Sequence, residues 1–291
     1  MSSEELQDLL RRVRRGLGLG WVLNLLLVGA GTLAVLGGWS HLLPGHAPQA
    51  DLVILLTVAG TWMVMTVSGA SSLRLVSAAT VHLADGRADL AERALLAGAT
   101  KFNLIAAPCV LAMQNLAALA HGAGRFDQSA AISRFLLQCH RRAARKLQLR
   151  NRLLLADSEL MQGDLQQAYA QLKVLYASEL PPAAQLALLP TACYYEVAVG
   201  AWECLAWAAK AREQLARLLP APQSGMTLAC LALGCQHQGR LPQRDWLFKQ
   251  ATLLVDRDAL VERLPLLAAL PGEAAMRLPW RKDGSVFGES R

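Results

Sequence analysis

The sequence has 291 residues, enough for one or two domains. Hydrophobic residues make up 54% of it and charged residues only 18%, a balance that excludes an ordinary soluble domain as the whole structure. The formal net charge is +7. We therefore expect part of the chain to lie in lipid.

The first predicted element is a membrane-spanning helix that follows a basic cytoplasmic segment, residues 1–18. No residue between Arg15 and Asp51 is formally charged, and the centre of this stretch is WVLNLLLVGAGTLAVLGGW, residues 21–39. A cleaved signal peptide is the alternative. The apolar run is too long for such a peptide, and no clean small-x-small cleavage site follows it.

A second crossing is expected after Pro44 and Pro48, which forbid a continuous helix. Residues 52–73 carry no charge, and about 20 apolar residues span the hydrocarbon core. Two buried helices of a globular core would usually carry a polar stripe. Arginines flank the pair and the loop between has no Lys or Arg, so both termini are predicted in the cytoplasm. Residues 19–73 thus form a two-helix transmembrane anchor.

A motif centred on a glycine recurs five times in the remaining chain, as in MQGDLQQAYAQL from Met161. The spacing is 37 to 39 residues, the regularity of a helical repeat array. Glycine accepts the left-handed conformation that ends a helix, so each copy predicts a helix, a turn and a second helix. The turn glycines are Gly86, Gly124, Gly163, Gly200 and Gly239.

Small residues at fixed distances from each glycine predict where the paired helices touch. Seven residues before the glycine stand Ala79, Ala117, Ala156, Cys193 and Ala232. Five residues after it stand Ala91, Ser129 and Ala168, with the exceptions Leu205 and Arg244. Two residues after it, expected to pack under the turn, stand Ala88, Phe126, Leu165, Trp202 and Leu241.

This pattern resembles the tetratricopeptide repeat (TPR) family, in which a small residue, a turn glycine and an alanine recur in each hairpin. The resemblance covers residues 74–255 and is strongest in LLLADSELMQGDLQQAYAQLKVLYASELPP. The period exceeds the family's 34 residues and an early aromatic is missing, so a related helical-hairpin repeat stays open. Either way the fold is all-α, with a TPR-like α-solenoid of about five helical hairpins over residues 74–270.

The C-terminal part is expected to close this array. The stretch DALVERLPLLAAL, residues 258–270, predicts a final amphipathic helix, and terminal repeats act as caps. Residues 271–291 contain turn residues and little apolar periodicity, so we expect a flexible tail there.

One segment, residues 128–156, carries the whole charge imbalance, because it contains seven cations and no acid. The candidates for binding an anionic group are Arg141, Arg142, Arg145, Lys146, Arg150 and Arg152. A solvated helix face, anionic lipid headgroups and an acidic protein partner are all open. Nucleic acid is the weakest candidate, because no aromatic residue is interleaved to stack on bases.

We expect no catalytic, cofactor or metal site. The sequence has no GxxxxGK[ST], HExxH or G-x-S-x-G motif. In CLALGCQH, Cys230 and His237 share a helix face while Cys235 points away, so core packing is favoured over zinc. Lone acids such as Glu159 and Glu196 are expected at helix surfaces. The spans hold no ionisable residue and are expected to anchor rather than conduct.

These expectations favour a membrane-anchored scaffold or adaptor, not an enzyme, whose cytoplasmic solenoid binds a protein partner and holds it at the membrane. A non-catalytic subunit of a membrane enzyme or export complex is one alternative. A peripheral protein that binds anionic lipid or shapes the membrane is the other. The excess of Arg, 23 against six Lys, suggests a GC-rich bacterial genome and hence an inner membrane.

Overall fold

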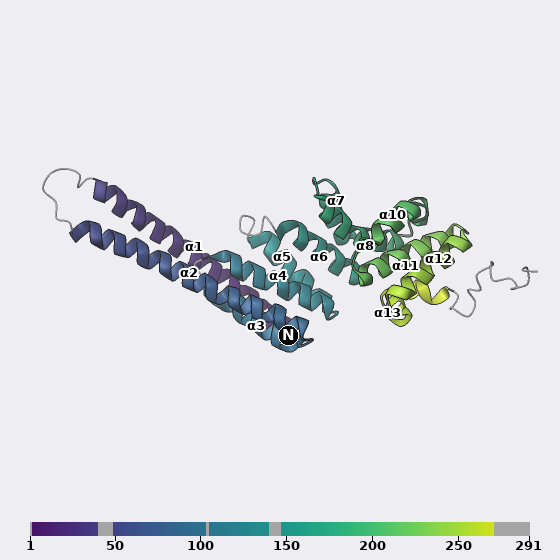
Figure 1. Ribbon diagram of the computed structural model, residues 1–291, viewed down its shortest axis with the longest axis horizontal. Helices are drawn as coiled ribbons and strands as arrows, with labels where there is room; N and C mark the ends of the chain where they lie inside the picture. The colour runs from purple at the N-terminus through teal and green to yellow at the C-terminus, as the bar shows by residue number, and fades with distance from the viewer. Residues whose placement is uncertain (1, 40–48, 103–104, 140–146, 271–291) are drawn as a thin grey trace, which may run out of the picture. The chain divides into compact units, whose positions relative to one another are not determined.

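The computed structural model describes residues 2–39, 49–102, 105–139 and 147–270 (Figure 1). The regular elements in these ranges are all helices, thirteen α-helices and a short 3-10 helix, so the predicted all-α class is confirmed. The predicted outer loop around Pro44 and the predicted tail lie outside these ranges. The chain divides into two compact units, Met1–Asp164 and Leu165–Arg291.

Two long helices, α1 (Ser3–Trp39) and α2 (Gln49–Ala84), run side by side in the first unit (Figure 1). α1 passes from the basic segment into the first predicted span without a break. α2 passes in the same way from the second predicted span into the first repeat. The predicted divisions after residues 18 and 73 therefore fall inside continuous helices.

Four further helices complete the first unit, and each packs on the next along the chain. They are α3 (Ala88–Thr100), α4 (Ala106–Gly122), α5 (Phe126–Cys139) and α6 (Gln148–Met161). The start of α1 also contacts this group, because Leu6, Leu9, Val13 and Leu17 follow helical spacing and are buried in the same core. The basic N-terminal segment is thus a core helix with its arginines on the other faces.

The second unit is a group of shorter helices around α11, which packs on α8, α9, α10, α12 and α13. The elements are α7 (Leu165–Tyr176), α8 (Pro182–Ala198), α9 (Trp202–Trp207), α10 (Ala209–Ala216), α11 (Ala221–His237), α12 (Leu241–Leu254), α13 (Arg257–Arg263) and the 3-10 helix η3 (Pro265–Ala269). The prediction of a single final helix over residues 258–270 was wrong, because α13 and η3 are separate elements there. Leu264 has φ −130° and ψ 81°, because the following Pro265 disfavours helical geometry at that position.

All five turn glycines end a helix in the same way. Their φ angles lie between 69° and 80°, in the left-handed region. Each glycine amide donates to the carbonyl three residues earlier, and the next amide donates to the carbonyl five residues earlier. At Gly124 these bonds run to His121 at 3.0 Å and from Arg125 to Ala120 at 2.8 Å. This is the Schellman motif, and the predicted turns are confirmed.

The small residues near each glycine are buried as predicted. The five residues that precede the glycine by seven positions, Ala79 to Ala232, all have 0% exposure. Four of the five that follow by five positions also have 0%, including the exception Leu205. The residue two positions after each glycine was predicted to pack under the turn, and this holds only in part. Ala88 and Leu241 are exposed, whereas Trp202 stacks on His237 at a centroid distance of 3.9 Å.

Candidate functional site

Apolar side chains cover the surface of α1 and α2 away from the first unit's core. Among the side chains described between residues 19 and 67, twelve large ones are between 46% and 69% exposed: Leu19, Trp21, Val22, Leu25, Leu26 and Val28 on α1, and Leu56, Val58, Trp62, Met63, Val64 and Val67 on α2. Three of them, Trp62 to Val64, are consecutive and so point to different sides of α2. A helix that is apolar on several sides and exposed needs an apolar environment.

One described segment, Val58–Ala84, is long and apolar enough to cross a membrane, with a mean hydropathy of 1.2. Only 22% of its apolar stretch is buried within the protein, which separates it from an ordinary core helix. This supports an association of the chain with a membrane. The predicted spans, residues 21–39 and 52–73, lie partly outside the residues whose side chains are described.

A groove of about 520 Å³ opens in the first unit, lined by parts of α2, α3 and α4. Its walls are mostly small or apolar, with Ala79, Leu83 and Leu119 among them. Asn115 and Arg150 add polar groups to the lining. Its volume lies within the range of sites that hold a ligand or a short segment of a partner.

The six candidate cations are only partly placed. Arg150 is exposed and lines the groove, and Arg152 is half-buried. The other four, Arg141, Arg142, Arg145 and Lys146, lie outside the described residues. The neighbouring Arg134, on α5, has a partner that the sequence did not indicate, since its guanidinium forms an ion pair with Glu159 of α6.

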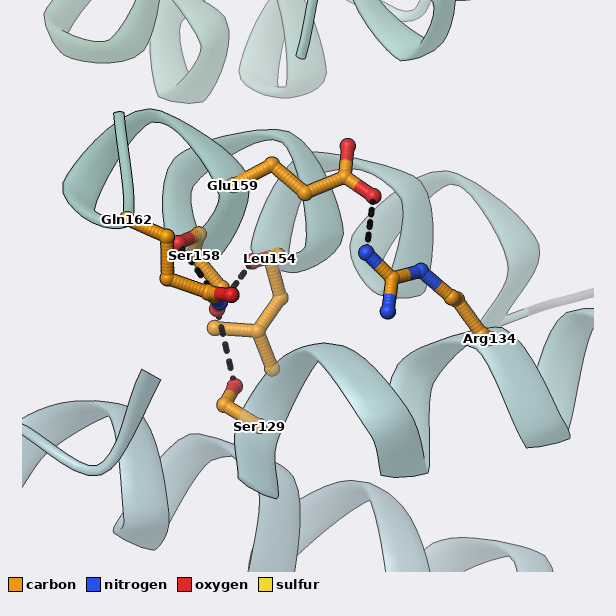
Figure 2. A network of polar contacts seen from close by, with 6 residues as sticks. All are labelled: Ser129, Arg134, Leu154, Ser158, Glu159 and Gln162. Atoms are coloured by element: carbon orange, nitrogen blue, oxygen red, sulfur yellow. Dashed lines mark hydrogen bonds and ion pairs between the residues drawn. The ribbon is translucent and has the colours of Figure 1, made fainter. Parts of the chain in front are cut away.

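Figure 2 shows this ion pair within a polar network between α5 and α6. The hydroxyls of Ser129 and Ser158 are 3.0 Å apart, and Ser158 Oγ also lies 2.8 Å from the carbonyl of Leu154. The side-chain amide of Gln162 donates to the Ser158 carbonyl at 3.1 Å. The small residue predicted at this helix contact, Ser129, thus provides a hydrogen bond as well as close packing.

The carboxylate of Glu159 is 1% exposed, so the prediction that it is a surface charge was wrong. Its Oε1 accepts a hydrogen bond from Arg134 at 3.0 Å, and its Oε2 has no partner among the described residues. Burial raises the pKa of Glu159, and the opposing effect of Arg134 is smaller. The position on α6 is buried because it faces the preceding hairpin, a relationship that the local sequence does not display.

Other buried polar side chains lie in α4, α5 and α6 of the same unit. Gln114, Ser133 and Asn151 are at most 1% exposed. Within the described ranges, their side-chain polar atoms have no hydrogen-bond partner. An unsatisfied buried polar group costs about 1 to 3 kcal/mol, so this part of the core is less stable than its apolar packing would suggest.

The second unit contains a half-buried ion pair between Glu196 of α8 and Arg212 of α10. Arg212 Nη2 donates to Glu196 Oε1 at 2.8 Å, and its Nη1 lies 3.8 Å from the thiol of Cys193. Glu196 is therefore a structural partner of Arg212, and not the solvated surface charge expected from the sequence.

The buried cysteines are poor nucleophiles. Burial raises the pKa of Cys109 to about 11 and that of Cys193 to about 12, and it also raises the pKa of Cys230. These thiols are protonated near neutral pH. Among the described residues, no group of three His, Cys, Asp or Glu side chains could hold a metal ion.

The comparisons with known proteins give no relative of this chain. No protein-family model, no curated protein and no solved structure matches it.

Proposed function

We propose that this chain is a membrane-anchored adaptor. In this proposal α1 and α2 cross the membrane as a two-span anchor, and a TPR-like solenoid binds a protein partner on the cytoplasmic side. The observation that carries the proposal is the exposed apolar surface of α1 and α2, which continues along unbroken helices into the buried core of the first unit.

Length and energetics support the anchor. Residues 19–39 of α1 would extend about 30 Å as a helix, the thickness of the hydrocarbon core. Each large apolar side chain transferred from water to lipid gains about 1.5 to 3 kcal/mol. Twelve such side chains on two helices therefore favour a membrane strongly over water. The positive-inside rule places the first unit's core in the cytoplasm, and the arginine-rich composition fits a bacterial inner membrane.

The repeat interpretation is supported by the five equivalent Schellman turns at 37- to 39-residue spacing. The small residues at constant distances from these turns are buried on the helices before and after each glycine. Repeat arrays of this kind bind partners along extended surfaces. The groove beside Arg150 is the candidate position, suited to an apolar segment that carries an acidic group.

The anchor is tested by alkaline extraction of membranes that contain the full chain. Wild type should stay in the membrane fraction. The double change Trp62→Lys and Val64→Lys should reduce insertion sharply, because a Lys at the centre of a span costs about 2.5 to 3.5 kcal/mol. The control is Trp207→Lys, at a tryptophan of the second unit that is 86% exposed. Release of wild type into the soluble fraction would contradict the anchor.

The adaptor role is tested by a photo-crosslinking residue placed in the groove at Ala118. A discrete protein adduct in native membranes should form there and should be absent from the exposed control position Gln138. Adducts at neither position would reject the groove as the binding surface. A partner that is itself a catalytic subunit, co-purifying in equal amounts, would instead identify the chain as a non-catalytic subunit of a membrane complex.

A further inference from the structure

The described residues between α3 and α4 are Lys101, Phe102 and Ile105, here called the α3–α4 corner, and they lie beside the long helix α2. Phe102 is 45% exposed and Ile105 is 40% exposed. The hydroxyl of Ser68 on α2 donates to the Phe102 carbonyl at 3.3 Å. The side chain of Ile105 packs over Gly69, since its Cδ1 would lie 3.6 Å from a Cβ at that position, an ordinary contact distance. Both contacts fix the corner to α2 at residues 68 and 69.

The height of this contact along α2 can be measured from the end of the predicted span, although Val81 (59%) and Leu83 (41%) are exposed beyond it. Leu73, the last residue of the predicted span, is 46% exposed, and the next residue, Arg74, is an exposed cation. Ser68 precedes Leu73 by five residues, or about 7.5 Å along a helix axis. The neighbouring Val67 is 59% exposed, so the corner touches α2 within its apolar exposed zone.

We infer that the α3–α4 corner, through Phe102 and Ile105, inserts into the membrane interface as a third contact that does not span the bilayer. This inference rests on the proposed anchor. Measured from the predicted end of the span at Leu73, the depth of about 7.5 Å agrees with the roughly 5 to 10 Å to which interfacial amphipathic elements bury their apolar face. The partner of this surface is the boundary between lipid headgroups and acyl chains.

The chemistry of the corner fits this boundary. Phe102 and Ile105 supply apolar side chains to this boundary, and Lys101 beside them is an exposed cation. A lipid surface is favoured over a second protein because the corner is continuous with the apolar exposed face of α2 at the same level. A third contact restricts the tilt of the first unit, so its groove is presented at a defined height above the membrane.

The test places benzoylphenylalanine in the full chain reconstituted into phospholipid vesicles, at one position in each sample. Phe102 is the test position, and the substitution keeps an aromatic ring there. Trp62, 69% exposed on α2, reports on the anchor. Leu90 is the matched control, because it is 39% exposed on α3 but lies about 15 Å before the end of that helix at Thr100, where the corner begins.

Irradiation should produce phospholipid adducts at Trp62 and Phe102 and none at Leu90, as measured by mass spectrometry of the labelled peptides. Adducts at Trp62 without adducts at Phe102 would overturn the inference and leave the anchor intact. A crosslink from Phe102 to a second copy of the chain would also overturn it. The absence of lipid adducts at Trp62 would reject the anchor and the inference together.

Discussion

The guanidinium of Arg134 and the carboxylate of Glu159 lie 3.0 Å apart, but Arg134 is 45% exposed and Glu159 only 1%. The pair joins α5 and α6, and its two residues are 25 positions apart in the sequence. Water can reach the cation, whereas the carboxylate is desolvated. The pair therefore offsets only part of the cost of burying the negative charge.

The first prediction follows from the raised pKa of Glu159. The folded state holds the proton of this carboxyl group more tightly than the unfolded state does. The contribution of the group to stability is therefore full below its ordinary pKa and is lost as the pH rises through its pKa in the folded state. Glu159→Gln should therefore lower Tm more at pH 5 than at pH 7. Thermal unfolding of the detergent-solubilised chain measures this difference. A larger loss at pH 7 would show that Arg134 stabilises the charged carboxylate more than burial disfavours it.

The second prediction concerns the geometry that the five turns share, tested at Gly124. Gly124→Ala should cost about 1 to 2 kcal/mol, because the residue has a φ of 74° and a Cβ is disfavoured in the left-handed region. Gly122→Ala is the control, since no atom lies within 4 Å of a Cβ built there and it ends α4 at an ordinary φ. Urea unfolding should separate the two variants. Equal midpoints would reject the assignment of strain.

The third prediction concerns the close contact of α11 with α9. A Cβ on Gly234 would lie 2.5 Å from the Cβ of Leu205 and 3.2 Å from the amide nitrogen of Ala206. Gly234→Ala must therefore displace α9, at a cost of about 1 to 3 kcal/mol. Leu205→Ala should not recover this loss when combined with it, because alanine retains the Cβ that makes the contact. A Gly234→Ala chain with unchanged thermal stability would contradict the packing.

The fourth prediction concerns thiol reactivity. Cys204 is exposed, whereas Cys109, Cys193, Cys230 and Cys235 are buried. A maleimide at pH 7 should modify Cys204 in the folded chain within minutes and the four buried thiols only after unfolding. Peptide mapping measures the extent of modification at each site. Modification of Cys193 in the folded chain at the rate of Cys204 would show that the second unit opens readily.

Some features were predictable because they are local. A glycine that must adopt positive φ, with small residues at fixed distances, specifies the turn and the buried helix contact within one stretch of sequence. The spacing of Leu6, Leu9, Val13 and Leu17 also carried a readable helical periodicity, but the adjacent arginines drew the interpretation toward a separate basic segment. The break at Pro265 was likewise available from the sequence, because the residue before a proline avoids helical geometry.

Other features depend on residues distant in sequence. The burial of Glu159 requires α5 to cover α6, and the pairing of Glu196 requires α10 to approach α8. Neither side chain differs locally from a surface glutamate. The position of the α3–α4 corner beside Ser68 is likewise set by the packing of α3 on α2, a contact between residues 34 positions apart. Tertiary packing decides these features, and periodicity alone does not.

The central claim is that the exposed apolar surface of α1 and α2 lies in lipid, and labelling from within the bilayer tests it most directly. Vesicles that contain the unmodified full chain and a phospholipid with a photoactivatable group near the end of its acyl chain are irradiated, and the adducts are mapped by mass spectrometry. The account predicts adducts within the two proposed spans, residues 21–39 and 52–73, and none in residues 109–139. Labelling of 109–139 at the same level, or no labelling of α1 and α2, would contradict it.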